Sequence, residues 1–345
     1  MNFIRNRNFR AGPQTSLEGF ICPQNSDKQQ KNKVFGRSGG VYLMPSNQST
    51  EAYIQLGLTN LTSIGVTGFI LISGYYGVKL KISRILSLWI QTTTYALASV
   101  LVISIFFGGS FIKKTVDAPL MLFDGCWWFV TDYLVLMLLS PFLNAGLDIL
   151  NKRQLLFIIW VISFIMYGAE WFHAKDASMP LLLFFNTYLV GRFIKLYPIN
   201  FVLKYKYPIF IIGLSLLIVE PMIFHAIGLD GKIKFVSGNF NVLVLITDIS
   251  LLQICLSHQK NGKGNFLTRN VLAIYLIHES EIGRRILHEN IFYDGRAIDF
   301  VFILAIVVFV VVASVLIEEV RRWLFGSFEK VCIAKVESIF NLDKK

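Results

Sequence analysis

Charged residues are scarce in this sequence. Asp, Glu, Lys and Arg make up 16% of its 345 residues, whereas hydrophobic residues make up 54%. In soluble globular domains roughly a quarter of the residues are charged, and the mean hydropathy of +0.57 reflects the same imbalance. The composition therefore excludes a water-soluble protein. It also excludes a disordered chain, because apolar residues that can build a core are abundant.

Closely spaced cysteines and the common catalytic and nucleotide-binding motifs are missing as well. Cys22, Cys126, Cys255 and Cys332 stand far apart, without the spacing of a disulfide framework or of a metal site. The sequence contains no Gly-x-Ser-x-Gly elbow, no P-loop and no dinucleotide-binding glycine pattern. We therefore predict no bound metal and no permanently bound cofactor.

Long apolar stretches are the dominant feature of the chain. A transmembrane helix needs about 20 mainly apolar residues, and from Leu58 onward such stretches alternate with short polar loops. Because backbone polar groups must be paired inside lipid, we expect the stretches to be helical. The predicted fold is an all-α, polytopic integral membrane helical bundle of about nine spans. The predicted spans are 58–78, 85–107, 122–147, 155–170, 180–197, 208–228, 235–256, 270–288 and 298–324.

Basic residues gather in every second loop, and the other loops dilute theirs with Asp and Glu. The positive-inside rule places the basic set in the cytoplasm, together with the C-terminal tail. Topology then accounts for the formal net charge of +11, so we expect contact with membrane lipid and none with nucleic acid. The basic set consists of Lys79, Lys81, Arg84, Lys152, Arg153, Arg192, Lys195, Lys204, Lys206, Lys260, Lys263 and Arg269.

The first 57 residues differ from the rest of the chain. Residues 1–57 are polar and basic and contain neither a transmembrane helix nor a secretory signal, so we expect an irregular N-terminal segment there. It would precede a membrane domain at 58–326 and a cytoplasmic tail at 327–345. The predicted topology would place this basic segment outside, which the positive-inside rule disfavours. One more helix before residue 58 would resolve the conflict.

Three segments carry a resemblance to a known family. They are GVTGFILISGYYG at 65–77, WWFVTDYL with LSPFLN at 127–144, and AIYLIHE at 273–279. Their order and spacing resemble those of the acyltransferase 3 family, the polytopic O-acyltransferases that modify bacterial surface glycans. The resemblance implies transfer of an acyl group, expected to be acetyl, from acetyl-CoA to a sugar hydroxyl of a surface or lipid-linked polysaccharide. It also implies a location in the bacterial inner membrane.

The chain departs from this family in one respect. Family members begin with a helix that carries an arginine and a histidine, the latter taken as the catalytic base, whereas residues 1–57 contain no histidine. We therefore expect an altered start, and a chain that is inactive or nearly so in this form. An in-frame helix bearing the two residues would be expected to restore activity.

His278 is the candidate catalytic base, because it alone among five histidines lies in a family-like motif. The alternative is a helix-end histidine paired with Glu279. Trp128 and Asp132 share a helix face and are candidates for binding the sugar, with a helix–helix hydrogen bond as the alternative for Asp132.

The segment at 65–77 and the loop that follows it supply the remaining candidates. Ser73 is either a lining residue of the acceptor site or a small residue that permits close helix approach. Lys79, Lys81 and Arg84 either bind the phosphates of coenzyme A or serve only as topological anchors.

Two other classes of protein remain open. A transporter or flippase of glycan precursors would also bury acidic residues such as Asp132, Glu220 and Asp248, although the sequence shows no repeated halves. An inactive fragment is the third alternative. For Glu220 and Asp248, structural roles are favoured. The oligomeric state cannot be derived from the sequence.

Overall fold

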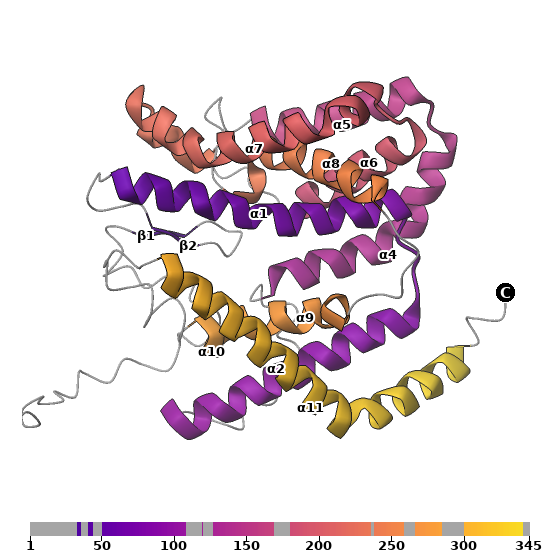
Figure 1. Ribbon diagram of the computed structural model, residues 1–345. Coiled ribbons are helices and arrows are strands. Elements are labelled where there is room, and N and C mark those ends of the chain that lie inside the picture. The colour runs from indigo at the N-terminus through magenta and orange to yellow at the C-terminus, as the bar shows by residue number, and fades with distance from the viewer. Residues whose placement is uncertain are drawn as a thin grey trace, which may run out of the picture.

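The computed structural model describes residues 33–35, 41–43, 50–107, 119, 127–168, 180–235, 238–258, 266–284 and 300–340. Within them the chain is a bundle of long helices (Figure 1). The long helices are α1 (Thr50–Tyr76), α2 (Ile82–Phe107), α4 (Trp128–Ile149), α5 (Lys152–Ser163), α6 (Pro180–Leu196), α7 (Asn200–Ala226), α8 (Val242–Ser257), α9 (Phe266–His278) and α11 (Phe300–Phe340).

Short elements complete the described chain. They are the antiparallel strands β1 (Lys33–Phe35) and β2 (Val41–Leu43), the π-helical turn η2 (Phe164–Gly168), the 3-10 helices η3 (Asp230–Phe235) and η4 (Gly238–Phe240), and α10 (Glu281–Arg284).

The all-α membrane bundle predicted from the sequence is confirmed. A helix occupies at least part of each predicted apolar stretch, and among the described residues four helices contain a segment long and apolar enough to cross a membrane. These segments are Leu56–Tyr76, Ile82–Ile105, Trp128–Ile149 and Asn200–Ala226, and α8 is a shorter apolar helix. The number of about nine spans stays a prediction.

One predicted boundary was wrong, and the predicted cytoplasmic tail, whose location stays a prediction, is largely helical. α1 begins at Thr50, inside the segment expected to be irregular, because Tyr53 is buried and hydrogen-bonded to Asp230 and so holds the first turns in place. α11 continues to Phe340 through most of the predicted tail, in which no proline interrupts the helix after Glu318. Most of residues 1–49 lie outside the described part of the chain, where the predicted irregular segment is not tested.

Helix α1 lies in the middle of the bundle, with α7 and α8 on one side and α4 and α9 on the other (Figure 1). It packs most closely against α6, where the two backbones touch. A Cβ atom at Gly74 would lie 2.3 Å from the carbonyl oxygen of Tyr188, and one at Gly191 would lie 2.4 Å from that of Leu71. Glycine is thus required at both positions for the helices to approach this closely.

Contacts between helix ends show which loops share an end of the bundle. Asn144 near the end of α4 hydrogen-bonds to Val78 after α1 and to Tyr188 of α6, and Arg269 at the start of α9 pairs with Glu319 of α11. We call this the basic end, because the basic loops predicted to share one side adjoin the end of α1, the end of α4 and the start of α9. Whether this end faces the cytoplasm stays a prediction.

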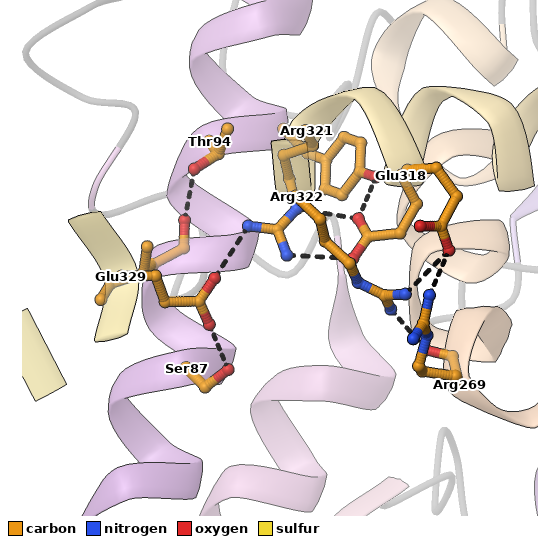
Figure 2. Close-up of polar contacts among 10 residues, drawn as sticks. Ser87, Thr94, Arg269, Glu318, Arg321, Arg322 and Glu329 are labelled. Carbon is orange, nitrogen blue, oxygen red and sulfur yellow. Dashed lines mark hydrogen bonds and ion pairs between the residues drawn. The ribbon is translucent and has the colours of Figure 1, made fainter. Parts of the chain in front are cut away.

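A buried carboxylate holds α11 against α2 at the basic end. Glu318 has no exposed surface and accepts hydrogen bonds from Tyr95 of α2 at 2.6 Å and from Arg321 at 2.8 and 2.9 Å. Arg322 adds an ion pair at 2.9 Å. Arg321 also reaches Glu329, which accepts a hydrogen bond from Ser87 of α2 (Figure 2).

The same network reaches α9. Arg269 pairs with Glu319 at 2.7 Å, and Arg322 donates to the backbone carbonyl of Arg269 at 2.8 Å (Figure 2). We call this set of residues the α11 ion-pair cluster. Each of its three arginines has a carboxylate partner, so the cluster fastens three helices together without leaving a guanidinium unpaired.

Candidate functional site

The three family-like segments meet in space around Phe129 of α4. Its ring lies 5.6 Å from that of Phe69 on α1, 5.3 Å from that of Phe184 on α6 and 5.5 Å from that of Tyr275 on α9. Tyr133, one turn further along α4, stacks on Phe129 at 6.2 Å. Aromatic pairs at these separations attract each other beyond the burial of their surface, so Phe129 joins segments that are far apart in the sequence.

His278 is the last residue of α9 and lies beside this aromatic group. Its ring is 5.8 Å from that of Tyr275, and Nδ1 is 2.7 Å from the carbonyl oxygen of Ile274. Because a carbonyl oxygen can only accept, Nδ1 carries the proton in this hydrogen bond and the lone pair of the neutral ring is on Nε2.

The other ring nitrogen of His278 has one acidic neighbour. Nε2 lies 3.6 Å from an oxygen of Glu279, and the side chain is about one third exposed, at 36%. When Nδ1 donates to Ile274 and the ring is neutral, Nε2 is the partly accessible nitrogen that can take a proton, as a general base requires. The contact with Glu279 is the one that the sequence alternative predicted.

Trp128 and Asp132 lie one turn apart on α4, as predicted. The Trp128 ring packs edge-on against Phe129 and Phe184, at 6.1 Å from each, so part of its surface is used in the bundle. Asp132 is half-buried. Its carboxylate makes no hydrogen bond to any side chain or backbone group in the described part of the chain, so the predicted helix–helix hydrogen bond is not seen there.

Ser73 lies where α1 faces α4. Its hydroxyl donates to the carbonyl oxygen of Phe69 at 2.9 Å and is 3.5 Å from the hydroxyl of Tyr133. The neighbouring Gly74 provides the close approach to α6. In the segment 65–77, the close approach of helices is thus provided by Gly74. Ser73 presents its hydroxyl toward α4.

The loop after α1 is held by a ring of hydrogen bonds. Gly77 ends the helix with φ of +77°, a conformation that favours glycine. The next residue, Val78, donates its N–H to the Tyr188 hydroxyl at 3.3 Å and accepts at 3.0 Å from the Asn144 amide. The Tyr188 hydroxyl donates to Asn144 at 2.7 Å. The Gly77 turn, residues 77–81, is thereby fastened to α4 and α6.

Lys79, Lys81 and Arg84 all project from this turn or from the start of α2, and all are exposed. The structure does not bring them next to His278, which ends α9 about 14 Å of helix rise beyond Arg269 of the basic end. The donor-side candidates and the candidate base are therefore separate groups of residues in this structure.

A comparison with protein families identifies the chain. The model of the acyltransferase 3 family, described as an acyltransferase domain, matches residues 34–319. The chain belongs to this family. No curated protein and no solved structure matches it.

Family membership makes the chain a multi-pass membrane acyltransferase, and it replaces the alternative of a transporter or flippase. The match includes all three segments that carried the resemblance. In this acyltransferase 3 protein those segments are also the ones that surround Phe129.

The acidic residues for which structural roles were favoured have partners in the bundle. Asp248 of α8, only 1% exposed, accepts a hydrogen bond from Thr67 of α1. Glu220 of α7 accepts one from Asn241, which caps α8, at 2.6 Å. Both carboxylates connect helices, and neither of these hydrogen bonds involves His278.

Sequence reasoning missed Phe129, Tyr188, Asn144 and Arg192 as members of the site. Phe129 and Asn144 lay within the quoted motif without a role assigned to them. Arg192 was counted only as a topological charge. The tertiary contacts of these residues are what distinguish them, and no spacing within a single helix predicts such contacts.

Proposed function

We propose that this acyltransferase moves an acetyl group from acetyl-CoA to a hydroxyl of a surface or lipid-linked polysaccharide in the bacterial inner membrane. The observation that carries the proposal is the meeting of the three family segments around Phe129, beside a histidine whose Nδ1 lies against a backbone carbonyl. A base near neutral pKa is what the attack of a sugar hydroxyl requires.

His278 is proposed to act as the base when the acceptor hydroxyl attacks the thioester. Nε2 takes the proton of the acceptor hydroxyl as its oxygen attacks the carbonyl carbon of the thioester. The new C–O bond forms, the C–S bond breaks, and the thiolate of coenzyme A leaves with the proton that the imidazolium returns. The hydrogen bond from Nδ1 to the Ile274 carbonyl stabilises the positive charge during this step.

Three side chains of the α1–α4 face are proposed to bind the acceptor. Asp132 has an acceptor-only carboxylate that suits a sugar hydroxyl, and Trp128 offers the ring surface left free by its edge-on neighbours. The Ser73 hydroxyl, close to that of Tyr133, supplies a further hydrogen-bonding group.

Lys79, Lys81 and Arg84 are proposed to bind the phosphates of the donor at the cytoplasmic face. Their exposure leaves them accessible from solution, and the Gly77 turn holds their backbone in a fixed place. In this arrangement the C-terminus of the chain is cytoplasmic. Reporter activity of a periplasmic enzyme fused after Lys345 would contradict that orientation.

The test of the function is a pair of matched histidine variants. His258 at the end of α8 also places Nδ1 against the carbonyl four residues earlier, at 2.9 Å, but its neighbours are Tyr207 and Ser257, away from Phe129. In this chain, for which the sequence predicts little activity, His278→Gln should lower the acetyl transfer that remains by about 10²- to 10⁴-fold. His258→Gln should leave the rate unchanged. Equal rates for the two variants would remove His278 from the chemistry.

A further inference from the structure

Arg192 of α6 occupies an unusual position beneath the Gly77 turn. It lies one helical turn after Tyr188, which fastens Val78, so the two side chains share a face of α6. A Cβ atom added to Gly77 would lie 3.2 Å from Nη1 of Arg192. The guanidinium therefore approaches the turn at the one residue that has no side chain.

This guanidinium lacks a counter-ion among the described residues. Arg192 is half-buried, its Nε is buried, and that nitrogen has no hydrogen-bond partner in the described part of the chain. An unpaired buried donor is costly, and more so when it belongs to a charged group. Arg321, by contrast, has both Glu318 and Glu329.

The surroundings of Arg192 add positive charge. Lys195, one turn further along α6, places its ammonium 4.7 Å from the ring centre of Tyr75. Lys79, Lys81 and Arg84 follow in the turn and the start of α2, and none of them has an ion pair within the described ranges. A half-buried arginine thus lies against a turn that is followed by exposed cations, an arrangement that favours a multiply charged anion.

We propose that Arg192 binds a phosphate group of the acyl-CoA donor and forms one site with Lys79, Lys81 and Arg84. This inference rests on the proposed function and adds a residue from a second element to the donor site. The planar guanidinium can bind a phosphate through two parallel hydrogen bonds, and its partial burial strengthens the ion pair relative to one in open solvent. The exposed lysines would attract the donor, and Arg192 would fix its position.

The site is tested by titrating the purified protein in phosphatidylcholine nanodiscs with coenzyme A and with pantetheine, which has the same thiol arm without phosphates. We expect wild type to prefer coenzyme A. Arg192→Gln should weaken coenzyme A binding by about 10- to 100-fold and leave pantetheine binding unchanged. Arg192→Lys keeps the charge and loses the two parallel hydrogen bonds. Its affinity for coenzyme A should lie between those of wild type and Arg192→Gln. Arg153→Gln, which removes an exposed arginine at the start of α5, should bind as wild type does.

A second measurement uses the wild-type protein, so it does not require any variant to fold. Phenylglyoxal modifies accessible arginines, and mass spectrometry of the wild-type protein would locate the modified ones. Coenzyme A should protect Arg192, and pantetheine should not. Protection of Arg192 by phosphatidylglycerol in the nanodisc, without protection by coenzyme A, would assign the site to a lipid headgroup and overturn the proposal.

The outcomes separate this inference from the function on which it rests. If the triple change of Lys79, Lys81 and Arg84 to Gln weakens coenzyme A binding and Arg192→Gln does not, Arg192 is excluded and the donor loop stands. If wild type binds coenzyme A no better than pantetheine, neither Arg192 nor the loop with Lys79, Lys81 and Arg84 binds the donor phosphates. Suppose that coenzyme A binding depends on Arg192, but a version carrying the family's first helix acylates no glycan. That result would support the site and contradict the proposed acceptor.

Discussion

The α11 ion-pair cluster and the Gly77 turn both gather basic residues at one end of the bundle, yet their partners differ. In the cluster, Arg321 and Arg322 surround the fully buried Glu318, and every guanidinium has a carboxylate (Figure 2). At the turn, Arg192 has a buried nitrogen without a partner in the described chain. Cations that the protein itself neutralises serve its structure, whereas cations left without a counter-ion are available to a ligand.

The largest loss of stability is expected from changing Glu318, whose role in the α11 ion-pair cluster is purely structural. Glu318→Gln leaves two arginines beside a neutral amide, and breaking a buried pair in this way costs about 3–5 kcal/mol. Thermal unfolding in detergent should therefore occur at a clearly lower temperature. Glu319→Gln, which removes an exposed pair with Arg269, is the control and should change the unfolding temperature far less. Equal shifts would mean that burial does not set the strength of this cluster.

The glycine contacts beneath the turn provide the second prediction. Gly74→Ala places a methyl group against the Tyr188 carbonyl, and such overpacking costs about 1–3 kcal/mol. Because the change pushes α1 from α6, it should also disturb the position of Gly77 over Arg192 and weaken donor binding. Gly65→Ala on the same helix has open space around it and should be neutral. Donor binding that survives a destabilising Gly74→Ala would separate the turn from α6.

A smaller and more selective effect is expected at Tyr188. Tyr188→Phe keeps the buried ring and removes the hydroxyl that joins Val78 to Asn144, a loss of about 1 kcal/mol for each hydrogen bond. The turn should loosen, so the KM for acetyl-CoA should rise while kcat stays constant. Tyr207→Phe, whose hydroxyl faces His258 at the surface, should change neither constant. An unchanged KM in the Tyr188 variant would show that the ring of hydrogen bonds does not order the donor site.

The smallest effect is expected at the opposite end of α1 from the turn. Hydrogen bonds from His225 at 2.8 Å and from Tyr53 at 2.9 Å lower the pKa of Asp230 below its usual range. A lowered pKa in the folded state stabilises the protein above the unfolded pKa of about 3.9, and this contribution is lost as the pH falls further. Asp230→Asn should lower the unfolding temperature slightly at pH 7, and the difference from wild type should shrink below about pH 4. A difference that is constant with pH would contradict the assignment.

The sequence predicted the helices and the family motifs well, because both depend on local apolar stretches and short spacings. It did not predict that α1 would begin at Thr50, since the hydrogen bond from Tyr53 to Asp230 joins residues far apart in the chain. Lys79, Lys81 and Arg84 were weighed as phosphate ligands, whereas Arg192 was interpreted only as a topological charge. Whether a cation is paired, as Arg321 is, or lacks a described partner, as Arg192 does, depends on contacts between helices and cannot be derived from a charge count.

If donor phosphates bind the cations around the Gly77 turn, removing those cations raises the KM for acetyl-CoA. This KM is measured in steady-state acetyl transfer by two variants of a version that carries the family's first helix. With Lys79, Lys81 and Arg84 all changed to Gln, the account predicts a raised KM with kcat and unfolding temperature unchanged. With Arg321→Gln it predicts a lowered unfolding temperature and an unchanged KM in the folded protein. A wild-type KM in the triple variant would contradict the account and leave these residues only their role in membrane topology.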